Sequence, residues 1–210
     1  MMGDSLTLHT APSVSFVDDA VLWAHLRLDL TGSPAEPYDK ALVDAYRDAV
    51  QSHLDGVDGV LGRALITQTW SMTLNGFPVC YDRIHGDQRI TLPLPPLQSV
   101  ASITYIDLDG VEQTLAPSAY RVLMRGTDRG AVVPAYGTSW PATRAIKQSV
   151  TVRFVAGYGD TAADVPKGIQ QAALLLMTDL YENRSAHEVG TIISANRTVD
   201  ALLMPFRMFL

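Results

Sequence analysis

The sequence contains a single cysteine, Cys80, and few charged residues, and both scarcities limit what the protein can do. One cysteine cannot form an internal disulfide and gives no basis for a cysteine-based metal cluster, so we interpret Cys80 as a small apolar residue on a strand. Charged residues make up 18% of the chain and hydrophobic residues 47%, whereas soluble domains carry about 25% charged residues. More surface than usual must therefore be covered by something other than water. Subunit contacts or a large buried core would both serve.

The chain also lacks an excess of basic charge. Its 16 Lys and Arg stand against 22 Asp and Glu, which gives a formal net charge of −6. Binding to phosphate groups requires clustered Lys and Arg, so we expect DNA near this protein to be repelled rather than held. The scattered arginines of the middle region lack the interleaved aromatic residues of a single-strand binder.

Long apolar runs are missing as well. No stretch approaches the roughly 18 apolar residues of a membrane span. Residues 1–13 have neither a basic segment nor an apolar core, so we expect no secretion signal there. We expect the protein to be made and kept in the cytoplasm, unless it leaves inside a larger particle.

Patterns that support catalysis or metal binding are absent from the sequence. No two of the five histidines have the spacing that places two ligands on one helix face, and no nucleophile elbow occurs. Gly56, Gly59 and Gly62 are neither preceded by a strand nor followed by Lys-Ser/Thr, so they indicate a helix end and turn rather than a phosphate loop. Asp107 and Asp109 flank a hairpin tip, where a cation site and turn chemistry are the two interpretations; we favour turn chemistry.

The hydrophobic periodicity changes twice along the chain. It is helical at 15–30 and about 37–54, alternates from residue 63 onward, and becomes helical again at 166–183 and 199–204. Asp109-Gly110 is a strong two-residue hairpin signal. The predicted strands lie at about 63–74, 88–92, 99–108, 111–115, 120–124, 131–134 and 148–156.

This order predicts an α+β fold, in which N-terminal and C-terminal helices form one helical bundle and an antiparallel β unit of six or seven short strands is inserted into it. The expected division is a helical bundle domain of residues 1–62 and 158–210 and an inserted β domain of residues 63–157. The helix starting at Pro166 is apolar nearly all round, so we expect it to be buried.

The region from the last predicted strand through this helix carries a family resemblance. Residues 154–160 read Phe-Val-Ala-Gly-Tyr-Gly-Asp, Val165-Pro166 opens the helix, and the helix ends in Leu-Tyr-Glu-Asn-Arg. With the two N-terminal helices and the Thr-rich strand around Trp70, this order resembles the head–tail connector (adaptor) family of tailed phages and gene transfer agents, over about residues 14–184. The motif residues of the helix are Pro166, Ile169, Ala172, Leu176, Leu180, Tyr181, Asn183 and Arg184.

The resemblance implies a structural virion component rather than an enzyme, with no cofactor. Such adaptors form an oligomeric ring, commonly of twelve subunits, beneath the portal in the particle neck, and they join it to a stopper or tail protein. DNA passes through the channel without sequence-specific binding. The implied location is the neck of a virion or phage-like particle assembled in the host cytoplasm. The resemblance does not distinguish a phage from a gene transfer agent.

The C-terminal segment is apolar and aromatic around one arginine, a composition enriched at interface centres. It either folds back on its own helices or docks on another chain, and in connectors the equivalent segment commonly reaches the portal. The residues that would contact the portal are Met204, Pro205, Phe206, Arg207, Met208, Phe209 and Leu210. Two other functions stay open: another neck component, such as a stopper or tail terminator, and a small hydrolase or lyase whose site is not visible in the sequence.

Overall fold

The computed structural model describes residues 5–32, 35–78, 88–124, 126–183 and 197–208. The chain forms two compact units, each built from two separate stretches of sequence. Residues 1–13 and 67–158 make up one, here called the β unit, and residues 14–66 and 159–210 make up the other, here called the helical unit. Helices and antiparallel sheets thus occur in one chain, which is compatible with the α+β class expected from the sequence.

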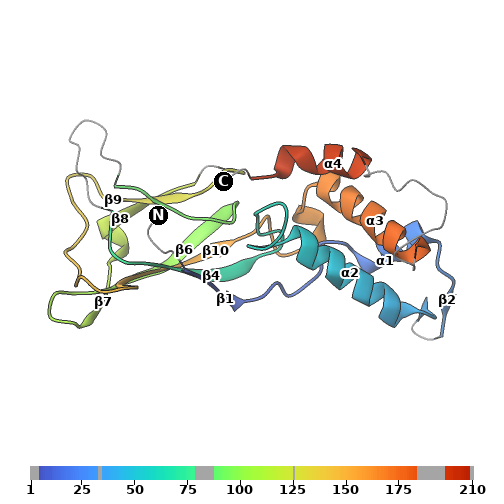
Figure 1. The fold of residues 1–210 in the computed structure, drawn as a ribbon, viewed down its shortest axis with the longest axis horizontal. Helices are drawn as coiled ribbons and strands as arrows, with labels where there is room; N and C mark the ends of the chain where they lie inside the picture. The colour runs from blue at the N-terminus through green and yellow to red at the C-terminus, as the bar shows by residue number, and fades with distance from the viewer. Residues whose placement is uncertain (1–4, 33–34, 79–87, 125, 184–196, 209–210) are drawn as a thin grey trace. The chain divides into compact units, whose positions relative to one another are not determined.

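The β unit contains a five-stranded antiparallel sheet with the order β1-β4-β10-β6-β7 (Figure 1). These strands are β1 (Ser5–Thr10), β4 (Gln68–Leu74), β6 (Leu97–Ile106), β7 (Glu112–Thr114) and β10 (Val150–Ala156). Every second residue of β10 is buried, from Val150 through Val152 and Phe154 to Ala156, as the alternation in the sequence predicts.

A second antiparallel sheet of the β unit has the order β5-β9-β8. It consists of β5 (Ile90–Thr91), β8 (Tyr120–Leu123) and β9 (Ala131–Pro134), and a short 3₁₀ turn, Pro117–Ala119, precedes β8. Gly130 at the start of β9 allows a close approach, because a Cβ there would lie 2.6 Å from Leu97 Cβ.

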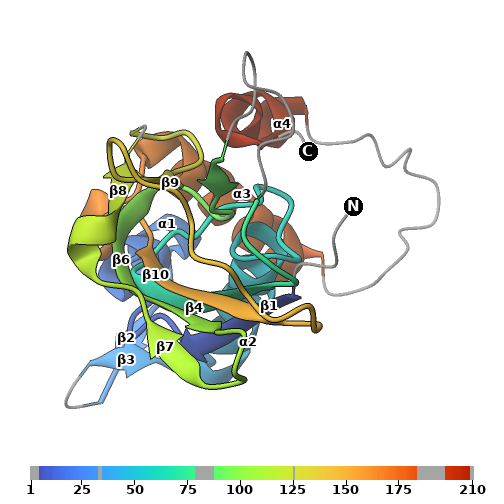
Figure 2. The same ribbon diagram turned by 90° about the vertical axis from the view of Figure 1, so that its left-hand side faces the viewer.

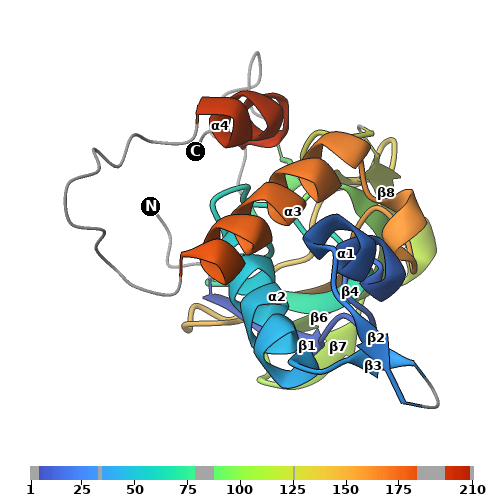
Figure 3. The same cartoon turned by 90° about the vertical axis from the view of Figure 1, so that its right-hand side faces the viewer.

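The helical unit holds four α-helices among its described residues: α1 (Asp19–Leu26), α2 (Lys40–Leu54), α3 (Lys167–Glu182) and α4 (Arg197–Leu203). A hairpin of β2 (Leu30–Thr31) and β3 (Glu36–Pro37) separates the first two helices. A 3₁₀ turn at Ala162–Asp164 precedes α3, and another at Met204–Phe206 follows α4. Helix α3 contacts α1, α2 and α4 (Figure 3), so it holds the unit together. Fully buried side chains of the helical unit include Phe16, Leu22, Leu54, Ile169 and Met177.

The N-terminal region differs from the expectation in two ways. Residues 5–10 form β1, which pairs with β4, so residues 1–13 belong to the β unit rather than to the helical one. The first helix is also shorter than the expected 15–30. It is capped by Asp18, whose carboxylate accepts hydrogen bonds from the backbone of Ala20 and Val21, and it ends where Arg27 adopts a left-handed conformation.

The three glycines after α2 form a helix end and turn. Gly56 and Gly62 have positive φ angles of 83° and 60°, which favour glycine. At Gly59 the chain passes so close to the end of α2 that a Cβ would lie 2.6 Å from the carbonyl oxygen of Leu54. Their spacing therefore has a backbone explanation.

Candidate functional site: the C-terminal segment and the helices that hold it

The carboxylates that the sequence singled out take part in turns and caps. Asp107 accepts hydrogen bonds from the backbone of Val111 (2.9 Å) and Asp109 (3.0 Å) and from the Gln113 amide (2.9 Å). The pKa of Asp107 is lowered, first by the Val111 backbone donor and then by Gln113. This is the turn chemistry favoured for the hairpin tip.

Asp164 closes the turn that leads into α3. Its carboxylate accepts the hydroxyl (2.8 Å) and the backbone N–H (3.0 Å) of Thr161, and the hydroxyl is the larger cause of its lowered pKa. A Cβ on Gly159 would lie 2.5 Å from the Asp164 carboxylate oxygen, so the second glycine of the Gly-Tyr-Gly turn makes room for this bond.

Helix α3 carries the family-motif residues, and their burial falls from its start to its end. Ile169 and Ala172 are fully buried, Pro166, Leu176 and Tyr181 are half-buried, and Leu180 is 39% exposed. The sequence predicted a helix buried nearly all round. In the structure α3 buries one face between Ile169 and Met177, while Lys167, Gln171 and Leu180 are exposed. Asn183 is exposed and its amide donates to Asp179, while Arg184 lies outside the described residues.

Two side-chain contacts fix α3 inside the helical unit. The Gln170 amide donates to the carbonyl oxygens of Ala162 and Val165, which fastens the preceding turn to the helix. At the other end, the Tyr181 hydroxyl donates to the Asp39 carboxylate (2.7 Å) just before α2 begins.

The buried face of α2 agrees only in part with the helical spacing of its sequence. That spacing predicts a buried stripe of Leu42, Ala45, Tyr46, Ala49, Val50 and His53 and a solvated face of Asp39, Lys40, Asp44, Arg47 and Asp48. In the structure Val50 is buried as predicted, Val43 and Leu54 are buried as well, and Ala45, Ala49 and His53 are exposed. Arg47, which was expected on the solvated face, is half-buried with 17% of its side chain exposed, and neighbouring carboxylates make this position acceptable.

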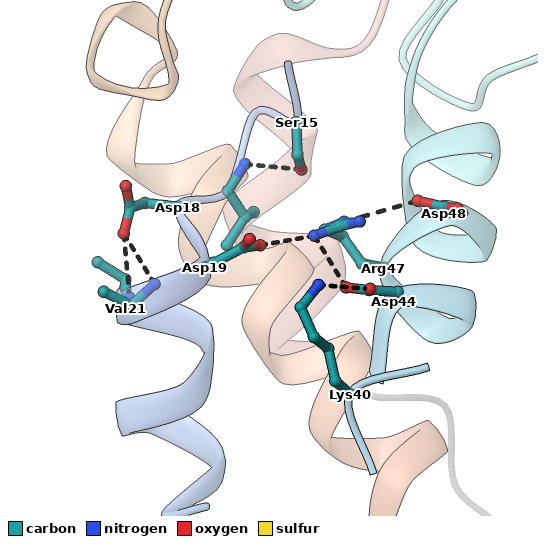
Figure 4. Close-up of polar contacts among 10 residues, drawn as sticks. Ser15, Asp18, Asp19, Val21, Lys40, Asp44, Arg47 and Asp48 are labelled. Atoms are coloured by element: carbon teal, nitrogen blue, oxygen red, sulfur yellow. Dashed lines mark hydrogen bonds and ion pairs between the residues drawn. The ribbon is translucent and has the colours of Figure 1, made fainter. Parts of the chain in front are cut away.

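Arg47 joins α2 to α1 through an ionic network (Figure 4). Its guanidinium lies 2.5 Å from Asp19, 3.1 Å from Asp44 and 3.5 Å from Asp48, and Lys40 pairs with Asp44 at 3.0 Å. Burial lowers the pKa of Arg47, but the hydrogen bond and charge of Asp19 together with the charges of Asp44 and Asp48 outweigh burial, and the pKa is raised. The network positions α1 against α2 in the helical unit.

The described part of the C-terminal segment lies against its own helical unit. Arg63 is 4% exposed, and its guanidinium donates to the carbonyl oxygen of Phe206 and to Met208 Sδ, the latter at 3.2 Å. The Met208 N–H donates to the carbonyl oxygen of Leu61 (3.0 Å). We call this group of contacts around Arg63 the Arg63 clamp.

Two further contacts order the segment. The Phe206 ring lies over Gly168 at the start of α3, where a Cβ would come within 3.0 Å of the ring. Arg207 pairs with Asp200 on α4 at 2.8 Å. Met204, by contrast, is 67% exposed, and Pro205 is exposed as well. Phe209 and Leu210 lie outside the described residues. The segment is thus held at 206–208 and presents Met204 and Pro205 to its surroundings.

Sequence reasoning missed Arg63. It stands at the expected start of the first strand and has no charged neighbour that suggests a partner, and its contacts lie 143 and 145 positions away. Within the described residues, no three His, Cys, Asp or Glu side chains gather as metal ligands would. None of the described helices has the length and apolarity to cross a bilayer.

No protein-family model matches the sequence, and no curated protein matches it. Solved structures do. The model superimposes on a chain of the "Virion of native gene transfer agent (GTA) particle" with a TM-score of 0.72 and 25% identity, covering 98% of this chain and 96% of that one. It also superimposes, with the same coverage, a TM-score of 0.73 and 25% identity, on a chain of the "Neck of empty GTA particle computed with C6 symmetry".

The chain is similar, over nearly its full length, to chains of gene transfer agent particles and their neck. A chain of the "Neck of native GTA particle computed with C12 symmetry" has the same fold at a TM-score of 0.64 and 22% identity. Because the coverage spans both units, the likeness includes the β unit and the helical unit together.

Proposed function

We propose that this protein is a structural component of the neck of a gene-transfer-agent-like particle, and specifically the connector that joins the portal to the stopper or tail. The observation that carries the proposal is the likeness to chains of such particles over 98% of this chain. The similar chains belong to a virion and to a particle neck, and this supports a structural rather than an enzymatic role for the protein.

The proposed assembly is a ring of copies through which DNA passes. Support comes from the symmetry of the neck in which one similar chain occurs, computed as six-fold. A twelve-subunit ring is compatible with that symmetry and is the stoichiometry that we propose. A ring repeats one heterologous interface, so a subunit with few charges can cover two of its faces with neighbours. The net charge of −6 would keep DNA from adhering to the channel.

We propose that the helical unit is the helical bundle domain expected from the sequence. Within the ring, we propose that the C-terminal segment of this unit contacts the portal. The Arg63 clamp holds residues 206–208, so the segment is preorganised for a partner, which lowers the entropic cost of docking. Among the described residues of that segment, Met204 is an exposed large apolar side chain. We therefore propose Met204 and Pro205 as portal-contacting residues.

A Met204→Asp variant tests the tail assignment, with Met124→Asp as its matched control. Met124 is a methionine of the β unit with 59% exposure, against 67% for Met204. We expect Met204→Asp to weaken binding to purified portal at least tenfold without lowering the unfolding midpoint, and Met124→Asp to bind normally. Equal portal binding by the two variants would reject the tail as the contact.

Deletion of the gene tests the connector role. Without a connector, capsids should package DNA but carry no attached tails, and free tails should accumulate. Electron micrographs of particles from the deletion strain provide the measurement. In the deletion strain, tails of the wrong length indicate a tail terminator instead, and capsids that fill with DNA and then lose it indicate a stopper.

A further inference from the structure

Among the described residues, strand β1 forms an edge of the five-stranded sheet that no further strand covers. It is six residues long, contains no Asp, Glu, Lys, Arg or Pro, and is exposed at every position except Leu6. One edge of β1 pairs with β4, from Ser5 opposite Thr73 to Thr10 opposite Thr69. Since β1 is the terminal strand of the sheet, its other edge faces away from the sheet. Proteins normally blunt such edges with charge, proline, shortness or a covering segment, because open edges add strands from other chains.

The opposite edge of the same sheet is protected. Strand β7 has three residues, begins with Glu112, and follows a hairpin tip whose Asp107 carboxylate is held by three donors. In the second sheet, β5 has two residues. The contrast within one unit indicates that β1 is an edge that the assembled protein covers.

We propose that β1 of each copy pairs with β8 of the next copy in the ring, so that the sheets of neighbouring subunits join edge to edge. This inference depends on the proposed neck ring, because a cyclic assembly needs two different surfaces on each subunit that fit each other. Strand addition at an open edge provides affinity through main-chain hydrogen bonds.

Strand β8 is the second surface for three reasons. It is the outer strand of the three-stranded sheet, and its four residues exceed the lengths of β5 and β7. Its one charged residue, Arg121, would meet no like charge on β1, which contains no Asp, Glu, Lys or Arg. Within the β unit, β1 and β8 lie on opposite sides (Figure 2), as a head-to-tail contact around a ring requires.

Crosslinking in assembled particles tests the pairing. In a Cys80→Ser background, we would combine Thr7→Cys, at the centre of β1, with Arg121→Cys on β8; both positions are exposed. A short bis-maleimide should then produce covalent oligomers that extend beyond the dimer. Thr7→Cys alone, and Thr7→Cys with Gln113→Cys on β7, should produce no such ladder.

A second variant pair tests the edge without crosslinker. Leu8→Lys places on β1 the charge that edge strands usually carry, and Leu108→Lys places it on an exposed leucine of the same unit outside a strand. Both variants should keep the wild-type unfolding midpoint. Leu8→Lys should reduce the copies per particle at least tenfold, and Leu108→Lys should not.

The outcomes separate this inference from the proposed function. A normal amount of the chain in particles, with no ladder from the β1–β8 pair and equal incorporation of the two lysine variants, overturns the edge pairing and leaves the neck role standing. A dimer from Thr7→Cys alone also overturns it, because it indicates symmetric β1–β1 pairing. Absence of the wild-type chain from particles overturns the neck role and the pairing together.

Discussion

Arg63 Nη2 lies 3.2 Å from Met208 Sδ, although the two residues are 145 positions apart in the sequence. The same guanidinium donates to the carbonyl oxygen of Phe206. One buried arginine therefore fixes the path of the chain after α4, and with it the segment to which we assign the portal contact.

Replacing Arg63 with Ala should loosen that segment. The substitution leaves the Phe206 carbonyl without its charged donor, and we expect a loss of about 1.5–3 kcal/mol in the free energy of unfolding. Urea denaturation measures the loss, and limited proteolysis should release the C-terminal peptide sooner. The control is Arg153→Ala, an exposed arginine on β10. Equal midpoints and equal proteolysis for the two variants would contradict the clamp.

Replacing Tyr181 with Phe removes one hydroxyl from the end of α3. That hydroxyl donates to Asp39 at 2.7 Å, so we expect a loss of about 1 kcal/mol in the free energy of unfolding. Tyr136→Phe is the matched control, because the Tyr136 side chain is 99% exposed. If both variants unfold at the wild-type midpoint, the Tyr181–Asp39 bond does not stabilise the helical unit.

Double-mutant cycles should rank the partners of Arg47. Asp19 lies 2.5 Å away on another helix, whereas Asp48 lies 3.5 Å away and is 73% exposed. Exposed ion pairs contribute about 0.2–1 kcal/mol, so we expect the Arg47–Asp48 coupling at the low end and Arg47–Asp19 at or above the high end. Thermal or urea denaturation of the single and double Ala variants provides the couplings. A larger coupling to Asp48 would show that the network does not join α1 to α2.

The turn at Asp107 should make the β unit acid-sensitive. The folded-state pKa of the Asp107 carboxyl is lowered. The stabilisation of the folded state by this carboxylate is therefore present above the unfolded pKa of about 4 and is lost as the pH falls through the folded value. An Asp107→Asn variant should therefore be less stable than wild type at pH 7, with the difference shrinking toward pH 2. Denaturation at both pH values measures it. A difference that stays constant between them would exclude the charge of Asp107 as the cause.

The parts of the fold that the sequence predicts well are those with strong local signals. Strand β10 alternates between buried and outward residues, as its sequence does. A Gly-Tyr-Gly turn and Pro166 then precede α3, so local residues also indicate where this helix begins. Asp109-Gly110 likewise marks the turn between β6 and β7.

The parts that sequence reasoning missed depend on distant partners. Strand β1 depends on its pairing with β4, because Leu6 and Leu8 alternate with polar residues but none of its six residues is buried. Arg47 on α2 is half-buried although periodicity assigns it to solvent, because it pairs with Asp19 on another helix as well as with Asp44 and Asp48 on its own. The contacts of Arg63 are equally remote. The spacing of apolar residues along a sequence cannot indicate which charged side chain will pair with a distant carbonyl or carboxylate.

A reconstruction of the neck of purified particles tests the central claim most directly. We predict density between the portal and the tail that fits copies of this fold in a closed ring, with β1 of each copy beside β8 of the next. Neck density that this fold does not fit, or copies of the chain in the capsid shell or at the tail tip, would contradict the account.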